Sequence, residues 1–241
     1  MLRVVSPEDY LRKAMAAKTT RWRGVYARRG LAVRSRLDKT THAMLLRQLY
    51  LALFEDERFD EALEVAKQAL ELDVLADVLC QDAARAAVAA GQLDEALVHL
   101  RSAARRGPAS RRPFHQWTLG SLLFLVQRYP KAISAFERAA RWGTTDKPLF
   151  RAHLALAKLA AGEPTPRLQE TLTDLAEAPC GQGYGRFVLG HLAYAAGEWA
   201  AAKKYLESFV KRSEGSRPSL AIALRGELSM AKATLAKMQA N

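Results

Sequence analysis

The sequence has few cysteines and no segment typical of a secreted or membrane-spanning protein. Only Cys80 and Cys180 occur in 241 residues, a hundred positions apart, so neither a disulfide framework nor a zinc ribbon is indicated. Residues 1–10 include acidic and proline positions where a secretory leader has an apolar core, and no apolar run approaches the length that spans a bilayer. These absences predict a cytoplasmic protein.

The sequence also lacks the short motifs of common enzyme classes. It contains no Walker A loop, no HExxH zinc motif, no GxSxG nucleophile elbow and no histidine pair at helical metal-ligand spacing. The glycine-rich run 181–186 (GQGYGR) does not have the dinucleotide-binding spacing, so we interpret it as a connector. An enzymatic site would have to join distant residues such as His153 and His191. We therefore predict that the protein is not an enzyme and binds no cofactor or metal.

Positive charge is in excess, with a formal net charge of +12. Residues 1–40 contain 11 Lys and Arg against 3 Asp and Glu, which leaves +4 for residues 41–241. Such a segment attracts nucleic acid, an anionic membrane or an acidic protein face, and charge alone does not separate these partners. The basic segment and a second arginine cluster near residues 101–112 together form a candidate basic patch. Its members are Arg21, Arg23, Arg28, Arg29, Arg34, Arg105, Arg106, Arg111 and Arg112.

An internal repeat is the main positive signal. The run RFDEAL at 58–63 is followed by QLDEAL at 92–97 and RYPKAI at 128–133, and EWAAAK at 198–203 continues the series after a skipped member. The aligned alanines, Ala62, Ala96, Ala132 and Ala202, are spaced by 34, 36 and 70 residues, and Ala84, Gly120 and Gly190 each lie twelve positions before one of them. Antiparallel helices need small residues where their axes approach to about 8–10 Å. The pattern therefore predicts a series of helical hairpins.

The run from Phe59 to Asp73 resembles the second helix of a tetratricopeptide repeat, and the resemblance extends over about residues 43–216. It implies an all-α, right-handed α-solenoid of about five hairpins. The fourth hairpin is degenerate, because its second helix contains Pro164 and Pro166. We expect residues 1–40 to form a basic N-terminal helical hairpin that caps the array, with a dedicated anion-binding helix as the alternative. Residues 217–241 are expected to form a C-terminal capping helix.

The resemblance also implies a binding surface, because such solenoids present a concave face lined by the first helix of each hairpin. The projected groove residues are Arg47, Gln48, Gln81, Arg85, Phe114, Trp117, Ser121, Phe124, His153, Tyr184, Phe187, His191 and Tyr194. The first half of this set is polar and the second half is aromatic. Trp and Tyr often anchor interfaces. In the alternative interpretation, several of these rings pack between neighbouring hairpins or against the C-terminal helix.

The resemblance thus implies a non-enzymatic adaptor or scaffold that binds a protein or peptide in its groove and serves in the assembly of a cytoplasmic complex. A partner with an acidic face would suit the positive charge. The alternative is a basic scaffold that binds nucleic acid or anionic membrane through the N-terminal helices. One subtype is disfavoured: its members hold a chaperone's C-terminal carboxylate with paired asparagines, and the only asparagine in this chain is Asn241.

Overall fold

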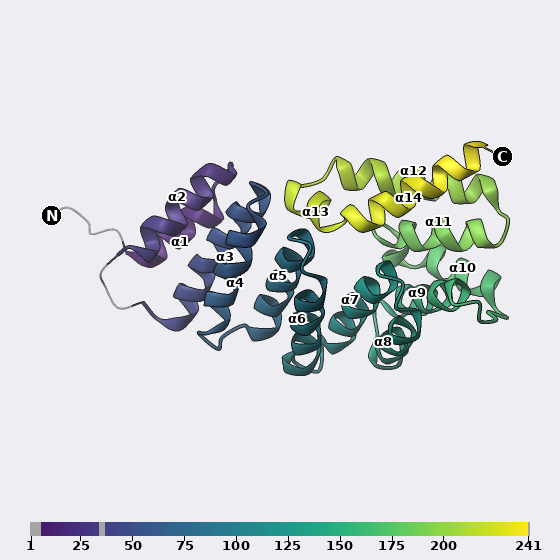
Figure 1. Ribbon diagram of the computed structural model, residues 1–241, viewed down its shortest axis with the longest axis horizontal. Coiled ribbons are helices and arrows are strands. Elements are labelled where there is room, and N and C mark those ends of the chain that lie inside the picture. Colours follow the sequence, from purple (N-terminus) through teal and green to yellow (C-terminus); the bar gives the residue numbers. More distant parts are fainter. Residues whose placement is uncertain (1–5, 34–36, 241) are drawn as a thin grey trace. The chain divides into compact units, whose positions relative to one another are not determined.

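The computed structural model describes residues 6–33 and 37–240, which form α-helices joined by short turns and one 3-10 helix, without a β-strand in these ranges (Figure 1). The predicted all-α class is therefore confirmed for the described residues. The chain divides into two compact units, Met1–Gly107 and Pro108–Asn241.

Unit 1 consists of three helical hairpins. Its helices are α1 (Pro7–Met15), α2 (Thr20–Leu31), α3 (Lys39–Glu55), α4 (Phe59–Leu70), α5 (Ala76–Ala89) and α6 (Leu93–Arg106). The second helix of one hairpin packs on the first helix of the next, as α2 does on α3 and α4 does on α5. Side-chain caps fix the starts of α1, α2 and α3, and at α2 the Thr19 hydroxyl accepts the backbone N–H of Trp22. Ser6 and Asp9 form a capping box at α1, and the Asp38 carboxylate accepts the backbone N–H groups of Thr40 and Thr41 at α3.

Unit 2 has three further hairpins followed by two C-terminal helices. Its elements are α7 (Arg112–Leu125), α8 (Tyr129–Trp142), α9 (Lys147–Ala160), α10 (Leu168–Glu177), the 3-10 helix η1 (Pro179–Gly181), α11 (Gly185–Ala195), α12 (Trp199–Glu214), α13 (Pro218–Ala223) and α14 (Arg225–Ala240). Pro164 and Pro166 lie in the turn before α10, which is the shortest second helix of these three hairpins. The segment predicted as a capping helix thus contains two helices, and α14 packs beside α12 and α11.

The small residues of the repeat lie where the paired helices approach most closely. All four aligned alanines, Ala62, Ala96, Ala132 and Ala202, are fully buried in second helices. A Cβ atom added to Gly120 would lie 2.6 Å from the Phe136 ring, and one added to Gly190 would lie 2.5 Å from the Leu206 side chain. Phe136 and Leu206 each follow an aligned alanine by four positions, so the same contact recurs in two hairpins.

The glycine-rich run 181–186 is a tight connector between α10 and α11. A Cβ atom at Gly181 would lie 1.9 Å from the Leu175 carbonyl oxygen, and one at Gly185 would lie 2.2 Å from the Cys180 carbonyl oxygen. Close approach of one backbone segment to another therefore accounts for these two glycines. Burial raises the pKa of the neighbouring Cys180 thiol.

Candidate functional site

In unit 1, two of the projected groove residues, Arg47 and Arg85, bind a buried carboxylate. Asp82 on α5 is 1% exposed, and it accepts hydrogen bonds from Arg47 Nε on α3 at 2.5 Å and from an Arg85 guanidinium nitrogen at 3.2 Å. Burial acts to lower the pKa of Arg47, but the charge and hydrogen bond of Asp82 outweigh it and the pKa is raised. The two projected glutamines, Gln48 and Gln81, are buried. Arg47 and Arg85 are therefore held in place by Asp82.

We expect Asp82→Ala to lower the free energy of unfolding by about 2 kcal/mol, because Arg47 would keep a partly buried charge without its counter-ion. The matched control is Glu61→Ala, which removes an exposed ion pair with Arg58 and should cost less than about 1 kcal/mol. Denaturant unfolding followed by far-ultraviolet circular dichroism measures both. Equal effects of the two substitutions would contradict a structural role for the Asp82 cluster.

In unit 2, the projected aromatic residues pack mainly against one another. The ring centroids of Trp117 and Tyr184 are 4.8 Å apart, those of Phe136 and His153 are 4.2 Å apart, and those of Phe187 and His191 are 4.6 Å apart. These residues come from α7, α8, α9, α11 and the position directly before α11, which Tyr184 occupies, so the rings form a continuous aromatic cluster across three hairpins. The buried members of the projected set are Ser121, Phe124, His153, Phe187 and His191.

The projection therefore needs a structural correction, because these five residues belong to the core of unit 2 and do not form an open groove surface. The observed ring contacts follow the alternative derived from the sequence, in which the rings pack between hairpins. Direct contact between the first helices α9 and α11 encloses side chains that a uniform repeat would leave open. The projected residues that keep exposed surface in unit 2 are Phe114, Trp117, Tyr184 and Tyr194.

His153 and His191 are neutral members of this cluster. Trp117 Nε1 donates to His153 Nδ1 at 3.2 Å, so the proton of the neutral imidazole is on Nε2. Burial lowers the pKa of His153 to about 3 and that of His191 to about 4. The Nε2 atoms of both rings lack a hydrogen-bond partner within the described part of the chain. Protonating either ring would place a charge in an aromatic interior.

The first turn of α14 closes over the aromatic cluster. The Tyr184 hydroxyl donates to Glu227 Oε1 at 3.2 Å, and Glu227 is only 6% exposed. Burial raises the pKa of Glu227 to about 7, against the lowering effects of a backbone hydrogen bond and the Tyr184 hydroxyl. Burial also raises the pKa of Tyr184, whose hydroxyl end is enclosed although the residue as a whole is partly exposed. A Cβ atom added to the adjacent Gly226 would lie 3.0 Å from Leu125 Cδ1 on α7.

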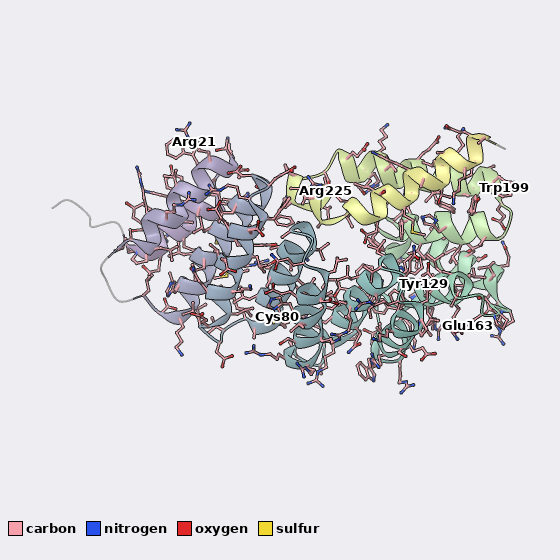
Figure 2. All side chains as sticks on the ribbon, in the orientation of Figure 1. Arg21, Cys80, Tyr129, Glu163, Trp199 and Arg225 are labelled. Atoms are coloured by element: carbon pink, nitrogen blue, oxygen red, sulfur yellow. The ribbon has the colours of Figure 1, made fainter. Side chains whose placement is uncertain are left out.

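The candidate basic patch falls on several separate elements. Arg21, Arg28 and Arg29 are exposed on α2, and the Arg21 side chain projects away from that helix (Figure 2). Arg23 is bound instead to Glu55 on α3 at 2.5 Å. The other members are Arg105 and Arg106 on α6, the latter paired with Asp73, and Arg111 and Arg112 at the start of α7, all exposed. Arg34 lies outside the described residues.

Comparison with known proteins supports the fold. No family model matches this sequence, and no curated protein matches it. Among solved structures, the crystal structure of the yeast Tom70 is similar with a TM-score of 0.57 and 14% sequence identity, covering 97% of this chain and 48% of that one. This chain thus spans about half the length of its structural neighbour. Tom70 contains tetratricopeptide repeats, so the likeness confirms the predicted α-solenoid of helical hairpins.

No group of three or more His, Cys, Asp or Glu side chains in the described ranges is arranged to hold a metal ion. None of the described helices has the length and hydropathy to cross a membrane.

Proposed function

We propose that this protein is a non-enzymatic adaptor that binds a partner protein on the first helices of unit 2. The observation that carries the proposal is a row of incompletely buried aromatic side chains, Phe114, Trp117 and Tyr184. Adjacent ring centroids in this row are 5.8 and 4.8 Å apart. Phe114 is 40% exposed at one end of the row. Because the rings beneath are fixed by core packing, the row offers a rigid apolar anchor of the kind that dominates interface energies.

The charge of unit 2 favours an acidic partner. Residues 108–241 contain 19 Lys and Arg against 10 Asp and Glu, a net charge of +9. Residues 1–40 are also basic, but residues 41–107 contain 7 Lys and Arg against 12 Asp and Glu, so unit 1 as a whole carries only +3. The larger share of the chain's positive charge therefore lies in the unit with the aromatic row. An acidic protein surface would be attracted to this unit over a long range.

The test is affinity capture from a lysate of the source cells, with nuclease treatment and moderate salt. The variant Phe114→Glu adds a negative charge at the exposed end of the aromatic row and should abolish capture of a discrete acidic protein. The matched control is Trp142→Glu, which changes a 47% exposed aromatic residue on the second helix α8. If both variants retain the same proteins as the wild type, the Phe114 end of the aromatic row is not part of the binding surface.

A second candidate function rests on the exposed surface of α2. Trp22 is 49% exposed and stacks on Tyr26 with ring centroids 5.6 Å apart, on the helix that also presents Arg21, Arg28 and Arg29. Arginines beside an aromatic pair suit the phosphates and bases of single-stranded nucleic acid. If this surface binds nucleic acid, Trp22→Ala should weaken oligonucleotide binding. The affinity for the oligonucleotide should also fall by orders of magnitude between about 50 and 200 mM salt. Binding that is insensitive to both changes would exclude it.

A further inference from the structure

The helix α14 occupies part of the surface that the proposed function needs. Its first turn contacts Tyr184 at the start of α11 through Glu227, and Gly226 lies against Leu125 in the last turn of α7. α14 also packs along α12, where Lys232 forms an ion pair with Glu214 at 2.6 Å. Arg225 marks the start of this helix (Figure 2). A segment of the chain itself therefore lies where a partner helix would approach the Tyr184 end of the aromatic row.

Few side chains of α14 are buried against the rest of unit 2. Its buried positions are Glu227, Leu228 and Ala231, and Met230, Leu235 and Met238 are partly buried, so Leu228 is the one large apolar side chain of α14 in the buried set. By contrast, the preceding helix α12 buries both Leu206 and Phe209. Glu227 contributes a carboxyl group to an apolar environment, and its raised pKa reflects the cost of ionising it there. A neutral amide at this position would keep a hydrogen bond to Tyr184 without that cost.

The net charge of α14 has the same sign as that of unit 2, although Lys232 pairs locally with Glu214. Residues 225–240 carry three basic side chains against one acidic one, a net charge of +2, on a unit whose total is +9. An acidic helix of similar length would exchange like-charge repulsion for attraction. The short helix α13, of six residues, and the turn at Gly215–Arg217 separate α14 from α12, so α14 is not a rigid continuation of the preceding hairpin.

We propose that α14 is a displaceable internal occupant of unit 2, and that an acidic amphipathic helix of the partner replaces it over Tyr184 and Leu125. This inference rests on the proposed adaptor function and specifies its partner as a helix. The partner binds only those molecules in which α14 is undocked. The apparent affinity for the partner therefore equals the intrinsic affinity multiplied by the undocked fraction. Release of α14 is therefore coupled to partner binding.

The probe is a fluorescent peptide of residues 218–241 with the changes Arg225→Glu, Glu227→Gln, Lys237→Glu and Gln239→Glu, which keeps Lys232 for its ion pair with Glu214, and the comparison peptide has the unmodified sequence. Fluorescence anisotropy measures binding of each peptide to the full-length chain. We expect the acidic peptide to bind at least about tenfold more tightly than the unmodified one. Hydrogen exchange in the same complex should show that the amides of α14 lose protection when the acidic peptide binds.

Two variants of the full-length chain change the docking of α14 in opposite directions. Leu228→Ala removes the most buried large apolar side chain of α14 and should increase the affinity for the acidic peptide about tenfold, whereas Glu227→Gln should decrease it. Gln239→Ala, at an exposed position of the same helix, is the control and should have no effect. Absence of peptide binding, retained protection of α14 in the complex, or a decrease with Leu228→Ala would each overturn the proposal.

These results are independent of the capture experiment. A lysate partner that depends on Phe114 while the peptide leaves α14 protected would support the adaptor and overturn displacement. Peptide binding that displaces α14, together with capture that is insensitive to Phe114→Glu, would support the helix site and exclude the Phe114 end of the row from partner binding.

Discussion

Replacing Gly190 with valine is expected to lower the free energy of unfolding of unit 2 by about 3 kcal/mol, the upper part of the range for overpacking a core. A Cβ atom at this position would lie 2.5 Å from both Leu206 Cδ2 and Cγ, and 3.2 Å from the Leu206 backbone nitrogen. The clash thus involves both a buried side chain and the backbone of α12. For a unit of this size, the loss corresponds to a decrease in melting temperature of roughly 10 °C.

The matched control for this substitution is Ala200→Val, at an exposed position of α12. It introduces the same β-branched side chain into a helix and should cost only about 0.5 kcal/mol. Trp117, Trp142 and Trp199 lie in unit 2, so tryptophan fluorescence in a Trp22→Phe background reports the unfolding of this unit alone. A loss of less than 1 kcal/mol for Gly190→Val would mean that α11 and α12 separate easily, contrary to the observed packing.

Acidification is expected to destabilise unit 2 by about 3 kcal/mol between pH 7 and pH 4, at 1.36 kcal/mol per pKa unit. Because the pKa values of His153 and His191 fall to about 3 and about 4 on folding, the unfolded chain binds more protons below pH 6.5 and stability decreases as the pH falls. Glu227 acts in the opposite direction. Its pKa rises to about 7, so its contribution is present below pH 4.5 and is lost as the pH rises through 7.

Glu227→Gln separates the two effects. Without the opposing contribution of the carboxyl group, the loss of stability between pH 7 and pH 4 should approximately double, because the two histidines then act alone. Urea unfolding at half-unit pH intervals, followed by tryptophan fluorescence in the Trp22→Phe background, provides the measurement. A pH profile that is the same for Glu227→Gln and the parent chain would show that Glu227 titrates normally and that α14 does not bury it.

The repeat pattern predicted the hairpins because helix pairing depends on local chemistry. Gly120 and Gly190 are small where a neighbouring helix approaches, and the aligned alanines mark the same crossings on second helices. These requirements are met within one hairpin of about 34 residues, so they leave a periodic trace in the sequence. The second helix of the fourth hairpin was predicted to contain Pro164 and Pro166, but α10 begins at Leu168 and both prolines lie in the turn before it, where they do not interrupt a helix.

The open surface was less predictable from that pattern. Phe187 and His153 occupy first-helix positions that the repeat phase projects into a groove, but contacts between α9 and α11 enclose them. The position of α14 is also absent from the repeat pattern, because it depends on residues more than 40 positions apart, as in the Tyr184–Glu227 hydrogen bond. Packing of the aromatic rings against a C-terminal helix was one of two interpretations of the sequence, and no feature of the sequence favoured it over an open groove.

The sequence by itself determined that this chain is an all-α protein of stacked hairpins, because the spacing of small and large residues specifies how each pair of helices meets. Only the tertiary structure decided which aromatic side chains are core and which keep exposed surface, and it placed a buried carboxyl group of α14 against Tyr184. Burial depends on which helices meet across several hairpins, and long-range packing of this kind leaves no periodic signal in the sequence.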